Sequence, residues 1–249
     1  MNDYNPFSLK EKVIFVTGAS SGIGKSIAIE CSRMGAKVII SGRNEGRLDE
    51  TFNELAGSGH IQIVADLSKE EEYLNLVKEL PALDGIVHSA GIIQHQPFQF
   101  INKESLEEIF TVNFMAPTLM TNAILRSKKL NKGGSIVFIS SLAGLNVTYP
   151  SGSSYSATKG AMNGVMRGMA LDLAPRKVRV NSICPGMIHT NIMDDTVTEE
   201  QLVEDAKKYP LKRYGNPEEV GHAAVYLLSD ASRWVTGSCL VIDGGLSIS

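Results

Sequence analysis

Seven short runs of aliphatic and β-branched residues recur along the chain. They occupy residues 13–16, 38–40, 61–64, 86–87, 136–139, 178–180 and 240–242. The runs are almost continuously apolar and do not alternate with polar positions, a pattern required of strands that are covered on both faces. We therefore predict seven buried β-strands.

The segments between these runs repeat apolar residues with the 3.6-residue period of an amphipathic helix. The predicted helices span residues 24–34, 45–56, 69–79, 103–128, 154–173 and 217–229. Because strand and helix alternate from one end to the other, we expect an α/β fold with a doubly wound parallel sheet and helices on both faces.

One long stretch, between Pro185 and Asn216, contains no predicted strand. Loops of that length in a compact α/β fold are typically functional lids or disordered segments. We predict a short helix near residues 199–208 within it, and we expect residues 187–215 to form a substrate lid.

The length of 249 residues favours one undivided domain spanning residues 1–249. The 24 Lys and Arg residues against 27 Asp and Glu residues give a net charge of −3. Nucleic acid and anionic membranes both require a concentrated cationic face, and no long basic block is present. We expect neither as a partner.

The three cysteines, Cys31, Cys184 and Cys239, are far apart and odd in number. They form neither a disulfide framework nor a metal-binding spacing, so we expect no metal and a reducing cytoplasmic location. The first residues lack the basic and apolar regions of a signal peptide, and no run approaches the ~20 apolar residues of a membrane span.

A glycine-rich turn follows the first predicted strand and leads directly into a helix. Glycines at such a turn let the backbone N–H groups approach a pyrophosphate, which the helix N-terminus then faces. The same turn has a second interpretation as a purely structural connection. The candidate cofactor-binding residues in it are Gly18, Ser20, Ser21, Gly22, Ile23 and Gly24.

The end of the second strand bears on the choice of dinucleotide. An NAD site normally presents Asp or Glu here to the ribose 2′-hydroxyl, whereas this chain has Gly42 and Arg43. A guanidinium binds a 2′-phosphate with two parallel hydrogen bonds, so the position favours NADP; Arg43 as a solvent-exposed loop charge is the alternative. After the third strand, Asp66 and Leu67 are placed to contact the adenine, although Asp66 fits a helix N-cap equally well.

Tyr155 and Lys159 are four residues apart at the start of a predicted helix, so their side chains share one face. A tyrosine works as an acid or base near neutrality when its pKa falls from about 10. An ammonium ~4 Å away in an effective dielectric near 20 contributes roughly 4 kcal/mol, or about three pKa units. We therefore expect Lys159 to lower the pKa of Tyr155, although this spacing also arises by chance.

Two further polar residues are candidates for the same site. Ser141 closes the fifth strand, at the sheet edge where catalytic groups of open α/β sheets gather. Its hydroxyl is suited to holding a substrate carbonyl beside Tyr155, and turn formation is the alternative role. Asn113 is a poor helix former within the predicted helix 103–128, where it either bends the helix or binds a water molecule.

The order of these motifs along nearly the whole chain resembles the classical short-chain dehydrogenase/reductase family, closest to its 3-oxoacyl-carrier-protein reductase-like members. The matching positions are Thr17, Gly18, Gly22, Gly24, Asp66, Ala90, Gly91, Asn113, Ser141, Tyr155, Lys159, Asn181, Pro185, Gly186, Asp243, Gly244 and Gly245. The resemblance implies a single Rossmann-type sheet of seven strands in the order 3-2-1-4-5-6-7, and a homotetramer.

The resemblance also implies the roles of the site residues. Ser141 positions the carbonyl or hydroxyl, and Tyr155 transfers the proton. Lys159 lowers the pKa of Tyr155 and binds the nicotinamide ribose, while Asn113 holds a water molecule in a proton relay. The remaining cofactor contacts implied are Ala90, Gly91, Pro185, Gly186, Ile188 and Thr190.

One segment departs from the family pattern. The family commonly has Asn-Asn-Ala-Gly after the fourth strand, where this chain has His88-Ser89-Ala90-Gly91. The small Ala-Gly pair that lets the cofactor approach is kept. We interpret His88 as a hydrogen-bonded core residue and not as a catalyst.

Together these features predict an NADP(H)-dependent oxidoreductase that interconverts a ketone and a secondary alcohol by hydride transfer. A 3-oxoacyl thioester carried on an acyl carrier protein is one candidate substrate, and a sugar, polyol or steroid-like alcohol is the alternative. Four basic residues could dock an acidic carrier protein: Lys128, Lys129, Lys132 and Arg176. The alternative is that they form an ordinary solvated surface. A non-catalytic NADP-binding protein is a hypothesis of another class, against which the intact catalytic set argues.

Overall fold

The computed structural model describes residues 4–145, 147–190 and 199–249. Its centre is a seven-stranded sheet in the order β3-β2-β1-β4-β5-β6-β7, in which every neighbouring pair is parallel. The strands are β1 (Val13–Thr17), β2 (Lys37–Gly42), β3 (Ile61–Val64), β4 (Leu83–His88), β5 (Leu130–Ile139), β6 (Arg179–Pro185) and β7 (Cys239–Ile242). The predicted fold class and strand order are confirmed.

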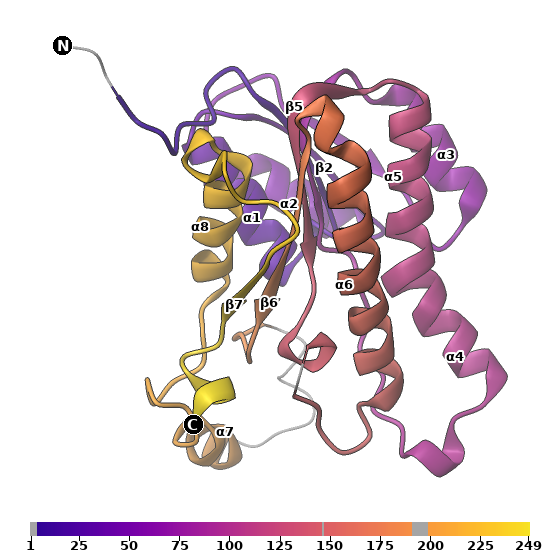
Figure 1. The fold of residues 1–249 in the computed structure, drawn as a ribbon, viewed down its shortest axis with the longest axis vertical. Helices are drawn as coiled ribbons and strands as arrows, with labels where there is room; N and C mark the ends of the chain where they lie inside the picture. The colour runs from indigo at the N-terminus through magenta and orange to yellow at the C-terminus, as the bar shows by residue number, and fades with distance from the viewer. Residues whose placement is uncertain (1–3, 146, 191–198) are drawn as a thin grey trace.

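Helices cover both faces of the sheet, which Figure 1 shows nearly edge-on, with α1 and α8 on one side and α5 and α6 on the other. The helices are α1 (Gly22–Arg33), α2 (Glu45–Asn53), α3 (Glu70–Glu79), α4 (Lys103–Phe110), α5 (Ala116–Arg126), α6 (Ser153–Leu173), α7 (Glu199–Ala206) and α8 (Pro217–Leu228). The short 3₁₀ segments are η1 (Phe98–Phe100), η3 (Leu142–Gly144), η4 (Ala174–Arg176), η5 (Asp230–Ser232) and η6 (Leu246–Ile248).

Two apolar clusters fill the spaces between the sheet and its helical layers. On β1, Ile14 and Val16 belong to the cluster that contains α1 and α8, and Phe15 between them belongs to the cluster that contains α3, α5 and α6. All three side chains are fully buried. Successive residues of a strand point to opposite faces, so a continuous apolar run is needed to supply both layers.

The helix predicted at residues 103–128 is interrupted in the structure. It consists of α4, a π-helical turn η2 (Thr111–Met115) and α5. Asn113 lies inside this π turn and is buried. A π turn carries one extra residue per turn, and such turns often occur at functional sites.

The predicted strand at 136–139 is also longer in the structure, since β5 begins at Leu130. Its first half contains Asn131, Lys132 and two glycines, which hide the apolar pattern. β6 likewise extends well beyond the run predicted at 178–180, from Arg179 to Pro185, and the remaining strands contain the apolar runs that predict them. None of the helices in the described ranges is long and apolar enough to span a membrane.

Candidate active site

All seven strands are parallel, so their carboxyl ends meet at one edge of the sheet. In Figure 1 this edge faces the bottom of the view, where β6 and β7 end near α7. Ligands of open α/β sheets bind at this edge. The predicted site residues follow β1, β2, β3, β4, β5 and β6, or lie on the helices that flank this edge.

The glycine-rich turn has the conformation of a phosphate loop. Gly18 and Gly22 adopt positive φ angles of 67° and 52°, where a side chain would be strained. A Cβ on Gly24 would lie 2.2 Å from the carbonyl oxygen of Gly18. Ser21 occupies the N-cap of α1 but forms no side-chain cap. The first N–H groups of α1 are thus oriented toward a space that suits an anion.

The segment after β4 packs directly on this loop. The Thr17 hydroxyl accepts hydrogen bonds from the backbone N–H groups of Ser89 (3.2 Å) and Ala90 (3.3 Å). A Cβ on Gly18 would lie 2.6 Å from the backbone nitrogen of Ala90. These backbone contacts do not depend on the side chains at positions 88 and 89, so the unusual His88-Ser89 pair leaves the two loops in register.

His88 is a buried core residue, as we expected. Its Nε2 lies 2.7 Å from the Thr121 hydroxyl, and its ring stacks on Phe138 with centroids 5.0 Å apart. Burial lowers the pKa of His88 to about 3, which keeps the imidazole neutral. A ring enclosed between β5 and α5 does not reach the site.

A groove of about 420 Å³ runs from the phosphate loop across α1 and α2. Ser20, Ser21 and the cations Lys25 and Arg47 are among its lining residues. Lys25 pairs with Glu54 at 2.8 Å. Gly42, the last residue of β2, packs closely against Ser20. A Cβ at position 42 would lie 3.0 Å from the hydroxyl oxygen of Ser20.

Arg43, directly after β2, is exposed, and its charge acts on Asp66. Burial opposes ionisation of Asp66, but hydrogen bonds from Ser68 and the positive charges of Arg43 and Lys69 outweigh it and lower its pKa. Asp66 Oδ1 accepts from the Ser68 N–H (3.0 Å) and hydroxyl (2.7 Å). Lys69, and not Asp66, is the N-cap of α3, so the N-cap alternative for Asp66 is wrong. Leu67 is buried in the core.

Asn113 connects the segment after β4 to α6. Its Oδ1 accepts from the Ile92 N–H at 2.8 Å, and its Nδ2 donates to the Ile92 carbonyl at 2.9 Å and to the Thr158 hydroxyl at 3.2 Å. A Cβ on Gly91 would lie 3.2 Å from Asn113 Oδ1 and 3.7 Å from Lys159 Nζ. Gly91, Asn113 and Lys159 therefore surround one small space.

Ser141 lies at the N-cap of η3, directly after β5, where its hydroxyl oxygen accepts from the Ala143 N–H at 3.2 Å. The turn packs on α6 through Gly144, whose Cβ would lie 2.6 Å from the Cβ of Lys159. Asn163 secures the contact by donating to the Gly144 carbonyl at 3.0 Å. Because η3 lies against α6, Ser141 is brought to Tyr155.

Tyr155 and Lys159 share one face of α6, as their spacing predicts. Lys159 Nζ lies 5.6 Å from the centroid of the Tyr155 ring. It donates to the Ile139 carbonyl at 2.8 Å. Burial lowers the pKa of Lys159 to about 8.

The expected fall in the pKa of Tyr155 is not found. Burial raises the pKa of Tyr155 to about 12, and a hydrogen bond with Ser141 opposes only part of that rise. The spacing argument assumed an ammonium about 4 Å from the phenol, whereas Lys159 points to the β5 backbone. Desolvation of a nearly buried phenol is then the dominant effect.

The residues that follow β6 return to the phosphate loop. Gly186 donates its N–H to the Ile242 carbonyl at 3.0 Å, and buried Ile188 forms a parallel bridge to Gly215. A Cβ on Gly22 would lie 3.3 Å from Cγ2 of Thr190. The Pro185–Thr190 segment thus spans the site from the end of β6 to the start of α1.

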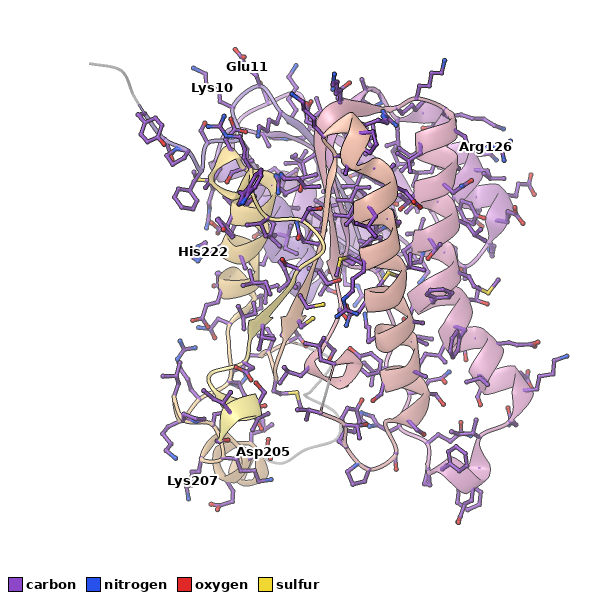
Figure 2. The ribbon with its side chains drawn as sticks, viewed as in Figure 1. Lys10, Glu11, Arg126, Asp205, Lys207 and His222 are labelled. Carbon is purple, nitrogen blue, oxygen red and sulfur yellow. The ribbon has the colours of Figure 1, made fainter. Side chains whose placement is uncertain are left out.

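Within the segment 187–215, the described parts are residues 187–190 and 199–215, and residues 191–198 lie outside the description. The Tyr209 hydroxyl accepts from the Met187 N–H at 3.3 Å. The Tyr214 hydroxyl donates to Asp205 at 2.7 Å, which ties α7 to the chain before α8. Figure 2 shows Asp205 at the same end of the molecule as the carboxyl edge of the sheet.

The basic residues considered for carrier docking lie elsewhere. Lys128, Lys129 and Lys132 flank the start of β5, and Arg176 donates to the Leu130 carbonyl there at 2.6 Å. Ser141 follows the opposite end of this ten-residue strand, about 30 Å away. Figure 2 shows Arg126, at the end of α5 that leads into β5, far from Asp205. The structure therefore places these cations away from the site entrance.

Several residues that build the site were missed in the sequence. Gly144, Thr158 and Asn163 hold the η3 turn, the segment after β4 and α6 together through the contacts described above. Asn163 lies four residues after Lys159, so the helical period alone places it on the same face. The sequence offers no comparable signal for Gly144, since its role depends on how closely η3 approaches α6.

Comparison with known proteins agrees with this architecture. A family model described as Enoyl-(Acyl carrier protein) reductase matches residues 18–247. The 3-oxoacyl-[acyl-carrier-protein] reductase FabG of Rickettsia felis is 33% identical over 238 residues, which cover 96% of this chain and 98% of the relative. The 2-(S)-hydroxypropyl-CoM dehydrogenase 3 of Xanthobacter autotrophicus is 34% identical over 251 residues, with 96% of this chain and 98% of the relative covered.

A solved structure from Agrobacterium tumefaciens, described as a candidate 2-deoxy-d-gluconate 3-dehydrogenase with bound NADP, superimposes with a TM-score of 0.89 at 29% identity, covering 99% of this chain and 100% of that one. The fold and site therefore define an oxidoreductase. The chain belongs to the classical short-chain dehydrogenase/reductase family, and within it lies close to the 3-oxoacyl-acyl-carrier-protein reductase-like members.

Proposed function

We propose that this protein is an NADP(H)-dependent oxidoreductase that interconverts a ketone and a secondary alcohol. The observation that supports this most directly is the close packing of η3, which follows Ser141, against α6, which carries Tyr155 and the buried Lys159. Two hydroxyl groups at one point are suited to a carbonyl oxygen, because one can orient it while the other transfers a proton. A purely dinucleotide-binding protein has no use for that arrangement.

The residues present fit a dinucleotide. Gly18, Gly22 and Gly24 form a backbone cradle that side chains would fill, and α1 begins with uncapped N–H groups. Gly91 lies beside Lys159, and Thr190 lies beside Gly22. Together with Ala90, Pro185, Gly186 and Ile188 on the same two segments, they are the proposed cofactor contacts between this cradle and Lys159. When bound, the nicotinamide supplies or accepts the hydride.

The preference for NADP rests on the end of β2. Gly42 presents no carboxylate, and its packing on Ser20 leaves little room for one. Arg43 follows Gly42 directly and is exposed, and Arg47, four residues further on, lines the groove with Ser20 and Ser21. Cations at this point favour an additional phosphate over a ribose diol. Solved relatives include the NADP-bound Agrobacterium protein described above.

In the direction of reduction, Tyr155 acts as the acid. With its pKa raised to about 12, the phenol keeps its proton at neutral pH and can donate it to the carbonyl oxygen. Ser141 donates a second hydrogen bond to the same oxygen. In the direction of oxidation Tyr155 must first lose its proton, and the charge of Lys159 stabilises the phenolate.

Asn113 serves the proton path through its backbone. Its side chain is fully engaged by Ile92 and Thr158, so it positions the segment after β4. Asn113 lies in the π turn, and residue 117, the partner of its carbonyl in a regular α-helix, is a proline without an N–H. The role proposed for this carbonyl is to hold a water molecule that resupplies protons toward Lys159.

The substrate is a small carbonyl compound, with either an acyl thioester or an oxygenated sugar-like ketone as its class. The curated relatives include a 3-oxoacyl-carrier-protein reductase. Solved relatives include the gluconate-type dehydrogenase from Agrobacterium tumefaciens. Residues 187–215 act as the substrate lid, because Tyr209 and Tyr214 tie the described parts of this segment to the end of β6 and to α7.

We further propose a cytoplasmic homotetramer. Cys31, Cys184 and Cys239 are all free thiols, as a reducing compartment requires. A Cβ on Gly164 or Gly168 of α6 would meet no atom within 4 Å, so this helix face leaves room for close approach of another subunit. Light scattering should give four chains per particle, and Gly164→Leu should lower that number; an unchanged particle would exclude this face from the interface.

The activity is tested by NADPH oxidation with a panel that contains an acetoacetyl thioester, 5-keto-D-gluconate and a crotonyl thioester as the enoyl control. We expect turnover of at least one ketone, and a loss of about 100-fold or more in Tyr155→Phe with NADPH affinity retained. Tyr4→Phe, which changes an exposed tyrosine far from the site, is the matched control. Equal turnover in the parent and Tyr155→Phe would refute the proposed acid.

A further inference from the structure

Three aromatic side chains form a row that leads outward from the catalytic tyrosine. The rings of Tyr155 and Tyr149 have centroids 6.5 Å apart, and the rings of Tyr149 and His95 have centroids 5.6 Å apart. Tyr149 is half-buried and His95 is exposed. Neither residue takes part in the catalytic set or in the cofactor cradle, so the place of Tyr149 beside Tyr155, and of His95 beside Tyr149, calls for another explanation.

The backbone around Tyr149 is built to hold its ring. Gly152 donates its N–H to the Tyr149 carbonyl at 3.0 Å, and Ser151 between them adopts a positive φ of 66°, which is costly for a residue with a side chain. A Cβ on Gly152 would lie 2.5 Å from the Tyr149 ring. The tight turn therefore presses the ring of Tyr149 onto the backbone at the start of α6.

The segment that carries His95 is fastened to this turn and to the helix behind it. The Gln96 N–H donates to the Ser151 carbonyl at 3.0 Å. The Gln96 side chain donates to the Phe100 carbonyl at 2.7 Å and accepts from the Ser105 hydroxyl at 2.9 Å. His95 is thereby held beside Tyr149 although it is exposed to solvent.

Both side chains offer hydrogen-bond donors along the part of the row that leads away from Tyr155. A phenol and a neutral imidazole each carry one polar hydrogen. Burial raises the pKa of Tyr149, so its hydroxyl stays protonated at neutral pH. Among the described residues, no hydrogen bond of the structure uses the Tyr149 hydroxyl or the His95 ring.

We propose that His95 and Tyr149 determine substrate specificity by donating hydrogen bonds to an oxygen substituent on a carbon close to the reacting carbonyl. The substrate class is then a hydroxy ketone or a keto acid, and not a ketone with a plain hydrocarbon chain. This proposal rests on the proposed function, because it names the substrate class of the same site. It adds two recognition residues to the catalytic set.

The test uses pairs of ketones that differ in one oxygen substituent. Acetoin and 2-butanone differ by a hydroxyl, and acetoacetate and 4-methyl-2-pentanone differ by a carboxylate in place of an isopropyl group. We expect the parent to have a kcat/KM at least about 10-fold higher for the oxygenated member of one pair. The pair that shows the preference tells whether the group recognised is a hydroxyl or a carboxylate.

Two variants remove the donors while keeping an aromatic ring at each position. Tyr149→Phe and His95→Phe should each lower the preference about 10-fold, the usual effect of losing one hydrogen bond, with little change for the hydrocarbon ketone. Tyr4→Phe and His222→Phe are the matched controls, since Tyr4 is exposed and His222 lies on α8, on the far side of the sheet from α6 (Figure 2). The controls should retain the parent's preference.

Three outcomes would overturn the proposal. A parent that reduces both members of each pair equally well has no such recognition, although the oxidoreductase function would stand. If Tyr149→Phe lowers kcat/KM equally for both ketones of a pair and also lowers the melting temperature, Tyr149 has only a structural role. A parent that binds NADPH but reduces no ketone would remove the proposed function, and this proposal with it.

Discussion

The ammonium group of Lys159 donates a hydrogen bond to the backbone carbonyl of Ile139, 2.8 Å away at the end of β5. The side chain is buried, and Gly144 packs against its Cβ. The amine is thus anchored to the strand that leads into Ser141, on one side of the Tyr155 ring. This anchor fixes where the positive charge acts, whereas the burial of the side chain makes that charge costly to keep.

Replacing this amine should change how stability depends on pH. Burial lowers the pKa of Lys159 from 10.5 to about 8, so at pH 7 the folded parent carries a charge that costs about 3 kcal/mol relative to the unfolded chain. That cost disappears as pH rises from 8 to 10.5, because the amine is then neutral in the folded protein. Relative to Lys159→Met, the unfolding free energy of the parent should rise by about 2–3 kcal/mol between pH 7 and 10.

Urea unfolding of both proteins at several pH values measures this difference. The control is Lys103→Met, which changes an exposed lysine of α4 and should give no such trend. A constant difference between the parent and Lys159→Met across the pH range would contradict the lowered pKa.

Cofactor selectivity should depend on Arg43. If its guanidinium binds the 2′-phosphate, Arg43→Ala should weaken NADPH binding by about 10- to 100-fold, as expected for loss of charge-assisted hydrogen bonds. NADH binding should change little. Fluorescence titration of both cofactors measures the two affinities, with Arg126→Ala as a control at the opposite end of the molecule (Figure 2). A larger loss for NADH would reverse our assignment.

The phosphate loop should not tolerate a methyl group at Gly24. A Cβ there would lie 2.2 Å from the Gly18 carbonyl oxygen, so Gly24→Ala must displace the loop and should abolish NADPH binding. Gly46 in α2 is the matched control, because its added Cβ would have 3.8 Å to the nearest atom. Gly46→Ala should bind NADPH normally and gain up to about 1 kcal/mol of stability. Calorimetry and cofactor titration of both variants test this contrast.

Acid should destabilise the protein through His88. Its pKa is lowered from 6.5 to about 3 by burial, so the unfolded chain binds a proton that the folded protein excludes. Stability should therefore fall by about 2 kcal/mol between pH 7 and 5 through this group alone. His88→Asn should remove that part of the pH dependence. If the two proteins lose stability in parallel over this range, the buried imidazole is not its source.

Much of the fold could be predicted because local pattern and tertiary packing agree. The apolar run at β1 supplies Ile14 and Val16 to one layer and Phe15 to the other, and that requirement is visible in the sequence. The early start of β5 was not predicted, because strand pairing with β4 at Leu130 overrides a polar, glycine-rich segment. Pairing with a neighbour is a tertiary property that local composition does not record.

The site also combines features that local sequence predicts with features that depend on tertiary contacts. The positions of Tyr155 and Lys159 on one face of α6 follow from helical spacing alone. The direction of Lys159 Nζ does not, because it depends on the carbonyl of Ile139 on another element. The engagement of the Asn113 side chain by Ile92 likewise joins residues 21 positions apart, which no local pattern reveals.

The π turn at Thr111–Met115 lets the helix absorb one extra residue locally. Removing one residue from the turn would restore a regular helix and leave α4 and α5 close to their present orientation. Asn113 lies inside the turn, so its side chain would change direction and lose its contacts with Ile92 and Thr158. The extra residue therefore shapes the site and leaves the packing of the two flanking helices unchanged.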